Sequence, residues 1–221
     1  MKKTICLVWF VCLWPCLVLA EIKLHVVDSA GLPISNAVIS VSSNAVSTDF
    51  ERDALSIKIP AVMDQIEKQF SPHVLIVDKG QSVVFPNSDQ VRHHVYSFSK
   101  PNDFEIRLYS GDQAEPVNFN YPGIAVLGCN IHDQMVGYIY IKDSEIAQLT
   151  DANGMAVFED VMINNPDEKL LVSVWHSRLS SNKTDRLVQT LEHQDENGIW
   201  QLSLELLPEI KKTIRKFKPR Y

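Results

Sequence analysis

The sequence predicts an all-β protein. Apolar and polar residues alternate in short runs such as 22–26 and 200–206, which is the period of a half-buried strand. Clusters of Gly, Pro, Asn and Asp separate these runs, and no long stretch has the period of an amphipathic helix. The 221 residues are enough for one or two domains with a proper core.

The N-terminus has the features of a secretory signal peptide. The chain opens with Met-Lys-Lys, continues with an apolar run as far as Ala20, and then reaches Glu21. This run is short for a membrane span, which needs about 20 apolar residues. We therefore expect residues 1–20 to be removed, leaving a soluble periplasmic protein without stable membrane insertion.

Cleavage would leave a single cysteine in the mature chain. Cys6, Cys12 and Cys16 belong to the predicted signal peptide, so only Cys129 remains. Cysteines of exported proteins normally form disulfides, because they meet oxidising conditions. A lone cysteine is then a buried inert thiol, a partner in an intermolecular disulfide, or a metal ligand.

The residues around Cys129 favour a metal site. Cys129, His132 and Met135 are spaced so that one tight loop can turn a thiol, an imidazole and a thioether toward one point. A blue-copper centre combines a thiolate, two imidazoles and a weak thioether ligand. The natural source of the second imidazole is the pair His93 and His94, which follows an apolar, strand-like run.

Only one of these two histidines is expected to face the metal. In a strand, neighbouring side chains point to opposite faces. A strand through this segment therefore sends His93, Val95 and Ser97 to one side. It sends His94, Tyr96 and Phe98 to the other.

Short strands are also expected through the middle of the chain. Residues 74–77 and 82–85 flank a Gly-containing turn and predict a β-hairpin. The segment 61–70 is ambiguous, because its apolar residues recur at helical spacing although the segment is short. Residues 124–127 and 136–141 predict the strands that enter and leave the cysteine-containing loop.

Two segments carry a resemblance to a known family. Phe85-x-Asn87 leading to a histidine, and Pro-Gly-x5-Cys-x2-His-x2-Met followed by Gly-Tyr-Ile, resemble the signature regions of cupredoxins such as plastocyanin and amicyanin. The resemblance covers residues 61–142 and implies a Greek-key β-sandwich or barrel that binds copper. The arrangement is also similar to exported proteins labelled methylamine utilization proteins.

The resemblance implies a set of copper ligands by position. Cys129, His132 and Met135 fall on ligand positions of the family pattern. A gapless alignment of residues 83–85 places His93 at the remaining ligand position, with His94 as the alternative.

The flanking segments resemble a second, smaller sandwich. Turn motifs at residues 28–33 and 150–154 are similar to those of carboxypeptidase-regulatory or transthyretin-like domains. Residues 21–45 would supply the first strands and 146–207 the others, which predicts that the cupredoxin-like segment is inserted into this sandwich. Residues 208–221 are expected to form a solvated basic tail, with docking to an acidic partner or a membrane surface as the alternative.

Charge and motifs narrow the expected function. The formal net charge is −6, and losing Lys2 and Lys3 with the signal peptide makes it −8, which argues against nucleic acid as a partner. The sequence has no Gly-rich phosphate loop, and nothing places Ser, His and Asp residues as a nucleophile triad. A site with two imidazoles, one thiolate and a weak axial sulfur suits both oxidation states of copper. We therefore expect a one-electron carrier with protein redox partners, and no enzyme.

Two alternatives stay open at this point. One is a copper storage or delivery protein, which usually has several exposed Met or His donors. The other is a non-redox binding module with a structural metal. If the chain is an electron carrier, an apolar collar of Ile131, Met135 and Val136 around His132 is expected to receive the partner.

Overall fold

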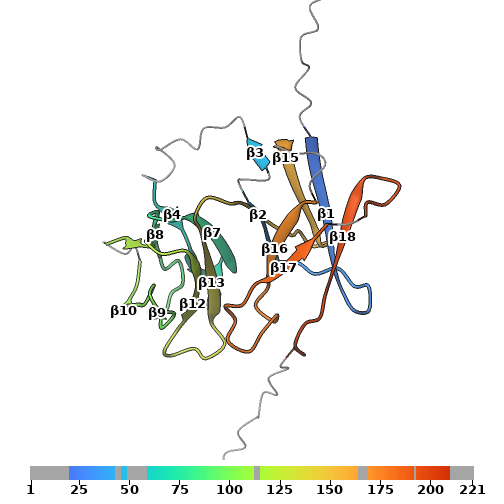
Figure 1. Cartoon of the computed structure of the whole chain (residues 1–221). Helices are drawn as coiled ribbons and strands as arrows, with labels where there is room; N and C mark the ends of the chain where they lie inside the picture. The colour runs from blue at the N-terminus through green and yellow to red at the C-terminus, as the bar shows by residue number, and fades with distance from the viewer. Residues whose placement is uncertain are drawn as a thin grey trace, which may run out of the picture.

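The structure is a computed structural model that describes residues 20–42, 46–48, 59–111, 115–163, 169–191 and 193–209. The predicted signal peptide lies outside these residues except for Ala20, and the predicted basic tail except for 208 and 209. Every regular element within them is a β-strand, which confirms the all-β prediction (Figure 1). No helix among the described residues is long and apolar enough to cross a membrane.

The strands, in chain order, are β1 (Ala20–Asp28), β2 (Val38–Val41), β3 (Val46–Thr48), β4 (Ala61–Val62), β5 (Asp64–Ile66), β6 (Gln69–Ser71), β7 (Val74–Asp78), β8 (Ser82–Val84), β9 (His93–Ser97), β10 (Phe104–Tyr109), β11 (Val117–Asn118), β12 (Gly123–Gly128), β13 (Val136–Lys142), β14 (Ile146–Leu149), β15 (Met155–Ile163), β16 (Leu171–Trp175), β17 (Leu187–Thr190) and β18 (Ile199–Leu204).

Four of the sheets stack as layers with an apolar core in each gap. The strand orders are β11-β8-β4, β10-β9-β12-β13-β7, β14-β2-β16-β17 and β18-β1-β15-β3. We call the first two sheets the central sandwich and the last two the terminal sandwich. A fifth, small sheet pairs β5 with β6 and contacts β13.

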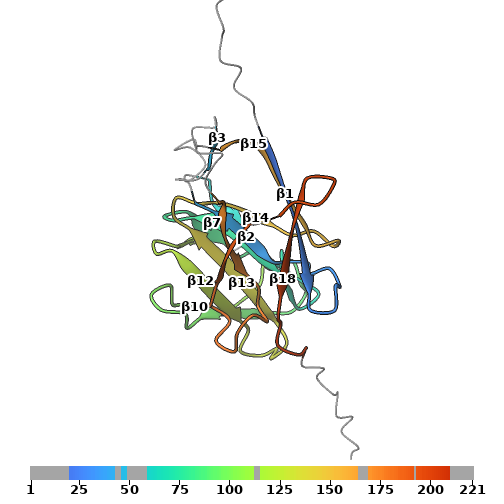
Figure 2. The ribbon, with the colours of Figure 1, turned by 45° about the vertical axis from the view of Figure 1, so that its right-hand side comes forward.

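The terminal sandwich combines strands from both ends of the chain. β1 lies between β15, with which it is antiparallel, and β18, with which it is parallel. Figures 1 and 2 show this arrangement, with the blue β1 beside the red β18 in both views. β2 likewise lies between β14 and β16. Each sheet of this sandwich therefore has an interior strand that comes from residues 20–42.

The strands β12 and β13 of the five-stranded sheet are buried on both faces. Ala125 and Leu127 of β12 point into the core of the central sandwich, whereas Ile124 points toward the terminal sandwich. β13 alternates in the same way, because Ile139 faces the first core and Tyr138 the second. This two-sided burial explains why both strands are nearly continuous apolar runs.

A small aromatic core joins the two sandwiches. Trp175 at the end of β16 is fully buried, and its ring lies edge-on to Tyr138 with 5.2 Å between the centroids. Tyr140 of β13 is also buried, and its hydroxyl donates to Ser40 Oγ of β2 at 3.0 Å. These contacts connect the sheet that carries β12 to the terminal sandwich.

The predicted hairpin over residues 74–85 is wrong. β7 pairs with β13, whereas β8 pairs with β4 and β11 in the opposite sheet. The turn itself forms as expected, since Gln81 N donates to Asp78 O at 2.9 Å and Gly80 has a φ of 86°. The turn therefore carries the chain from one layer of the central sandwich to the other.

The ambiguous segment 61–70 is not helical. It forms β4, β5 and the start of β6. Val62 and Ile66, which suggested helical spacing, are 51% and 44% exposed, while Met63 and Phe70 enter the core. The segment has the alternation of short strands, and its helical spacing is a coincidence.

Candidate metal centre

The centre lies where β12 leaves the sheet and turns into β13. Cys129 follows the last residue of β12 and is 3% exposed, within the core of the central sandwich. The loop then turns back, because Met135 N donates to His132 O at 2.9 Å, and β13 begins at Val136. This tight return places the loop side chains at one end of the sandwich.

His93 reaches the same point from β9. Its side chain is fully buried, and its Nδ1 lies 3.7 Å from Cys129 Sγ. The alternation predicted for this strand is observed, because Val95 and Ser97 are also buried while Phe98 on the other face is 80% exposed.

His94 points away from the cysteine. Its Nε2 lies 3.1 Å from a carboxylate oxygen of Glu105 on β10, and its ring lies edge-on to Tyr96. Of the two histidines that the sequence left open, the structure thus brings His93 to the thiol and directs His94 to the outer face of the sheet.

His132 is the third member of the group, beside His93 and Cys129. Its Nδ1 lies 3.8 Å from Cys129 Sγ, and its ring centroid is 5.0 Å from that of His93. The three ligand atoms all lie within 4.8 Å of one another. Among the described residues this is the one group of three or more His, Cys, Asp or Glu side chains whose ligand atoms come so close.

Met135 is buried beside this group. It is 1% exposed, belongs to the same apolar cluster as Cys129, and lines a hollow of about 710 Å³ together with His132. The hollow also contains Glu67, Lys68 and Asp133. It therefore gives solvent access to the His132 side of the centre through a polar opening.

Asp89 orients His93, although no motif in the sequence identifies this residue. Its Oδ2 lies 2.7 Å from His93 Nε2, and its two oxygens accept the backbone N–H groups of Glu67 and Lys68 at 2.7 and 2.9 Å. Burial acts to raise the pKa of Asp89, but these hydrogen bonds outweigh it and lower that pKa below its usual value. An ionised Asp89 accepts a hydrogen bond from the N–H group at Nε2, which leaves the lone pair on Nδ1 facing Cys129.

Asn87 holds the loop that carries Asp89. Its Nδ2 donates to the carbonyls of Val91 and Tyr109, each at 2.9 Å, and its Oδ1 accepts Asp89 N at 3.1 Å. Asn87 is 4% exposed. The amide therefore fixes the approach to β9 rather than contacting the centre.

The expected apolar collar around His132 is only partly present. Ile131 is 50% exposed, but Met135 is buried and cannot contact a partner. Val136 is half-buried between two hollows. The residues that open toward solvent beside His132 are instead mainly polar.

The donor set fits copper better than zinc. Structural zinc sites use four ligands from several Cys and His residues and do not use Met. One thiolate and two imidazoles beside a buried thioether are the donors of a blue-copper site. The residues that would hold the ion are His93, Cys129 and His132, with Met135 as the weak fourth ligand.

Among solved structures, the comparisons find similarity to copper proteins. No protein-family model matches the sequence, and no curated protein matches it. The chain is similar to a copper-containing nitrite reductase from Thermus scotoductus SA-01, with 25% identity and a TM-score of 0.36 over 38% of this chain and 22% of that chain.

Two single-domain copper proteins are also similar. A purple cupredoxin from Nitrosopumilus maritimus has 19% identity and a TM-score of 0.34 over 37% of this chain and 99% of that one. Amicyanin from Paracoccus versutus has 22% identity and a TM-score of 0.34 over 47% of this chain and 97% of that one. Because these TM-scores are low, the ligand assignment depends on the donor atoms of this chain.

Proposed function

We propose that this chain is an exported type 1 copper protein that carries single electrons in the periplasm. The observation that supports the proposal is the convergence of His93, Cys129 and His132, whose ligand atoms all lie within 4.8 Å of one another. Copper bound by such donors changes between two oxidation states with little rearrangement of its ligands.

The protein's own contribution is to fix the donors and exclude water. His93 and Cys129 are buried, and Asp89 holds the imidazole of His93 in one orientation through Nε2. Hydrogen bonds between a ligand and its neighbours fix both the ring and its tautomer. His132 is partly exposed and gives the centre an edge toward solvent.

The compartment and the partners belong to the same proposal. The signal peptide expected over residues 1–20 and the lone Cys129 of the mature chain support export. The resemblance to exported proteins labelled methylamine utilization proteins supports the same compartment. The partners would be other redox proteins, and the acidic formal charge disfavours nucleic acid.

A reversible redox cycle tests the proposed function. The mature chain is loaded with Cu(II), reduced with ascorbate and reoxidised with ferricyanide while the visible absorption is recorded. An electron carrier loses its colour, regains it fully over repeated cycles, and keeps one copper per chain. Loss of copper to a mild chelator in either state would instead favour storage or delivery, and a colourless zinc-binding chain would favour a structural metal.

A further inference from the structure

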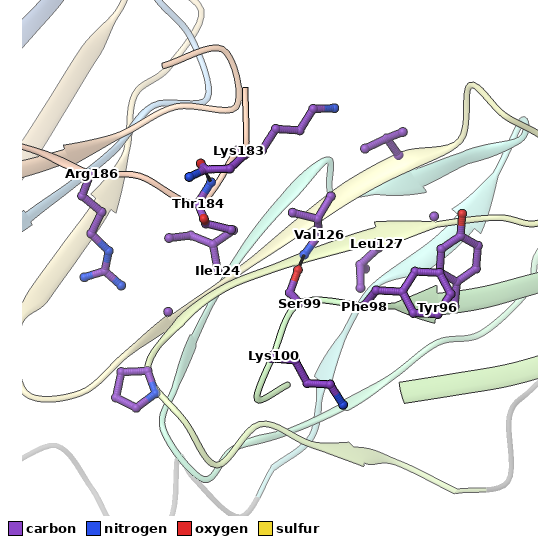
Figure 3. Close-up of a pocket in the computed structure, with 15 residues that line it drawn as sticks. Tyr96, Phe98, Ser99, Lys100, Ile124, Val126, Leu127, Lys183, Thr184 and Arg186 are labelled. Carbon is purple, nitrogen blue, oxygen red and sulfur yellow. Dashed lines mark hydrogen bonds between the residues drawn. The ribbon is translucent and has the colours of Figure 1, made fainter. Parts of the chain in front are cut away.

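A groove lies between the two sandwiches, on the side of the five-stranded sheet that faces away from the metal centre. It has a volume of about 1000 Å³. One wall comes from the end of β9 and its following loop, and the other comes from residues 182–186, which precede β17. Figure 3 shows Lys183, Thr184 and Arg186 on one side and Lys100 with the rings of Tyr96 and Phe98 on the other.

The wall from the terminal sandwich is anchored onto the sheet. Trp175 Nε1 donates to the carbonyl of Lys183 at 2.9 Å, and the Lys183 ammonium lies 5.9 Å from the ring centroid of Tyr138. The guanidinium of Arg186 lies 4.3 Å from the ring centroid of Tyr140 and pairs with Glu145 at 3.3 Å. The groove therefore has a fixed shape that needs both sandwiches.

The lining of the groove is cationic, although the chain as a whole is acidic. Its described lining residues include Lys100, Lys183 and Arg186 and no carboxylate. Asp103 beside the groove pairs with Lys100 at 2.6 Å, but the Lys100 side chain remains 78% exposed. A positive groove on a chain of net charge −6 is complementary to an acidic partner.

Phe98 gives the groove an exposed apolar anchor. Its side chain is 80% exposed, the highest value among the large hydrophobic residues that the structure describes. Its ring centroid lies 4.8 Å from that of Tyr96, so the Tyr96 ring supports it. Exposed aromatic residues that are rigidly supported are the usual energetic centres of protein interfaces.

The floor of the groove reaches the metal-binding loop. Tyr96 lies so close to Gly128 that a Cβ added there would be 2.7 Å from the Cζ and Oη of the tyrosine. Gly128 is bonded to Cys129, so Phe98, Tyr96 and Gly128 form continuous contacts between the groove and the thiol. A partner bound here would be close to the centre without contacting His132.

We propose that this groove is the docking surface for an acidic redox protein that presents carboxylates around an apolar centre. Phe98 contacts the apolar centre of the partner, and Lys100 and Lys183 contact its carboxylates. The proposal names the partner surface and depends on the proposed electron-carrier function only for its biological meaning, because binding itself needs no metal.

Binding is tested on the metal-free mature chain. The probe is a fluorescein-labelled, glutamate-rich synthetic peptide with one central tryptophan, and its anisotropy gives the affinity. We expect binding that weakens as salt rises above about 0.1 M, because the screening length is then only about 10 Å. In amide NMR spectra of the isotope-labelled protein, the peptide should cause the largest shifts at Ser99, Lys100, Lys183 and Thr184.

Matched variants separate this groove from general charge. Lys100→Glu with Lys183→Glu should weaken peptide binding on the order of tenfold. Lys23→Glu with Lys79→Glu makes the same change in net charge elsewhere and should leave binding near the parent value. Equal losses in the two double variants would overturn the proposal.

The aromatic anchor has its own control. Phe98→Ser should weaken binding about fivefold or more. Leu32→Ser removes another exposed apolar side chain, 61% exposed on a turn of the terminal sandwich, and should have no effect. Unchanged binding in Phe98→Ser would contradict the proposed anchor.

Three further outcomes distinguish the hypotheses. If phosphatidylglycerol vesicles bind to the groove and the peptide does not, the surface recognises lipid and the docking proposal is wrong. If the peptide binds as expected but the chain does not hold copper, docking stands and the electron-carrier function falls. If copper binds and the peptide does not, the reverse holds.

Discussion

At the residue scale, the two ring nitrogens of His93 contact different neighbours. Nδ1 lies 3.7 Å from Cys129 Sγ, and Nε2 lies 2.7 Å from Asp89 Oδ2. Asp89 is in turn held by two backbone N–H groups from the turn at Glu67 and Lys68. The orientation of a buried ligand thus depends on a carboxylate that never touches the metal.

Removing that carboxylate should weaken copper binding without unfolding the protein. We expect Asp89→Ala to lower copper affinity by about 10–100-fold, since loss of a ligand's hydrogen-bond partner has this effect in other metal sites. Competition with a chelator measures it. Asp103→Ala removes an exposed carboxylate paired with Lys100 and is the control. Equal affinities in the two variants would mean that Asp89 does not orient His93.

The burial of His176 should make folding stability depend on pH. Burial, followed by the positive charges of Arg178 and His73, lowers its pKa from 6.5 to about 4. The unfolded chain therefore binds more protons than the folded one between these values, and stability falls as the pH drops from about 6.5 to about 4. Well above pH 6.5 the residue is neutral in both states, so stability no longer changes with pH through His176.

The variant His176→Gln should remove this contribution. Between pH 7 and 4.5 the parent should lose about 2.5 kcal/mol more unfolding free energy than the variant, as measured by urea titration. His193→Gln changes an exposed histidine and should keep the parental pH dependence. Parallel pH profiles of the parent and His176→Gln would contradict the assignment.

At the element scale, the spacing of residues in the sequence predicted the metal-binding loop. It did not predict contacts between residues that are distant in sequence. Cys129, His132 and Met135 lie within one loop, so their grouping could be read directly from the sequence. Asp89 could not, because its function depends on backbone groups of a turn more than twenty residues away.

The wrong hairpin has a similar cause. The turn at residues 78–81 has the local hydrogen bond and the positive-φ glycine of a hairpin turn, but β7 and β8 belong to different sheets. What decides between the two outcomes is where β13 and β4 lie, and neither strand is adjacent to the turn in sequence. The alternation within each strand was predictable, whereas the pairing between strands was not.

Two Asp-x-x-Gly turns of the terminal sandwich provide an element-scale prediction. Asp151 Oδ1 accepts the N–H groups of Asn153 and Met155, and Gly154 has a φ of 73°. A Cβ at Gly154 would lie 2.4 Å from the carbonyl oxygen of Val26. Asp195 accepts two N–H groups in the same way, but a Cβ at Gly198 would meet no atom within 4 Å.

The two glycines should therefore respond differently to the same substitution. Gly198→Ala should cost about 1 kcal/mol of unfolding free energy, because only the positive φ of 76° is unfavourable. Gly154→Ala should cost about 2 kcal/mol more, since β1 must also shift away from the turn. Urea unfolding of both variants gives the comparison, and equal costs would contradict the close approach of β1.

At the scale of the whole molecule, the two ends of the chain form one sandwich and the middle of the chain forms the other. β1 and β2 come from residues 20–42, yet each is an interior strand among strands from the C-terminal third. The aromatic contact between Trp175 and Tyr138 then connects this sandwich to the sheet that carries the metal-binding loop. We expect the central segment to be an insertion in the terminal sandwich.

Fragments of the chain test this insertion. A fragment of residues 143–221 lacks both interior strands, so it should expose strand edges and give a poorly dispersed amide spectrum. Adding a peptide of residues 20–42 should restore dispersion. A well-dispersed spectrum from the fragment alone would show that the C-terminal strands form a sandwich by themselves. A fragment of residues 61–142 is expected to fold but to be less stable than the full chain, because it exposes Tyr138 and Ile124.

The proposed centre requires that the thiol of Cys129 and the imidazole of His93 hold copper. The most direct measurement is the visible absorption of the copper-loaded mature chain, recorded with metal content for the parent, Cys129→Ser and His94→Gly. We predict one copper per chain with an intense thiolate-to-copper band in the parent and in His94→Gly, and no such band in Cys129→Ser. An intense band that survives in Cys129→Ser, or one that disappears in His94→Gly while His93 is intact, would contradict the proposed centre.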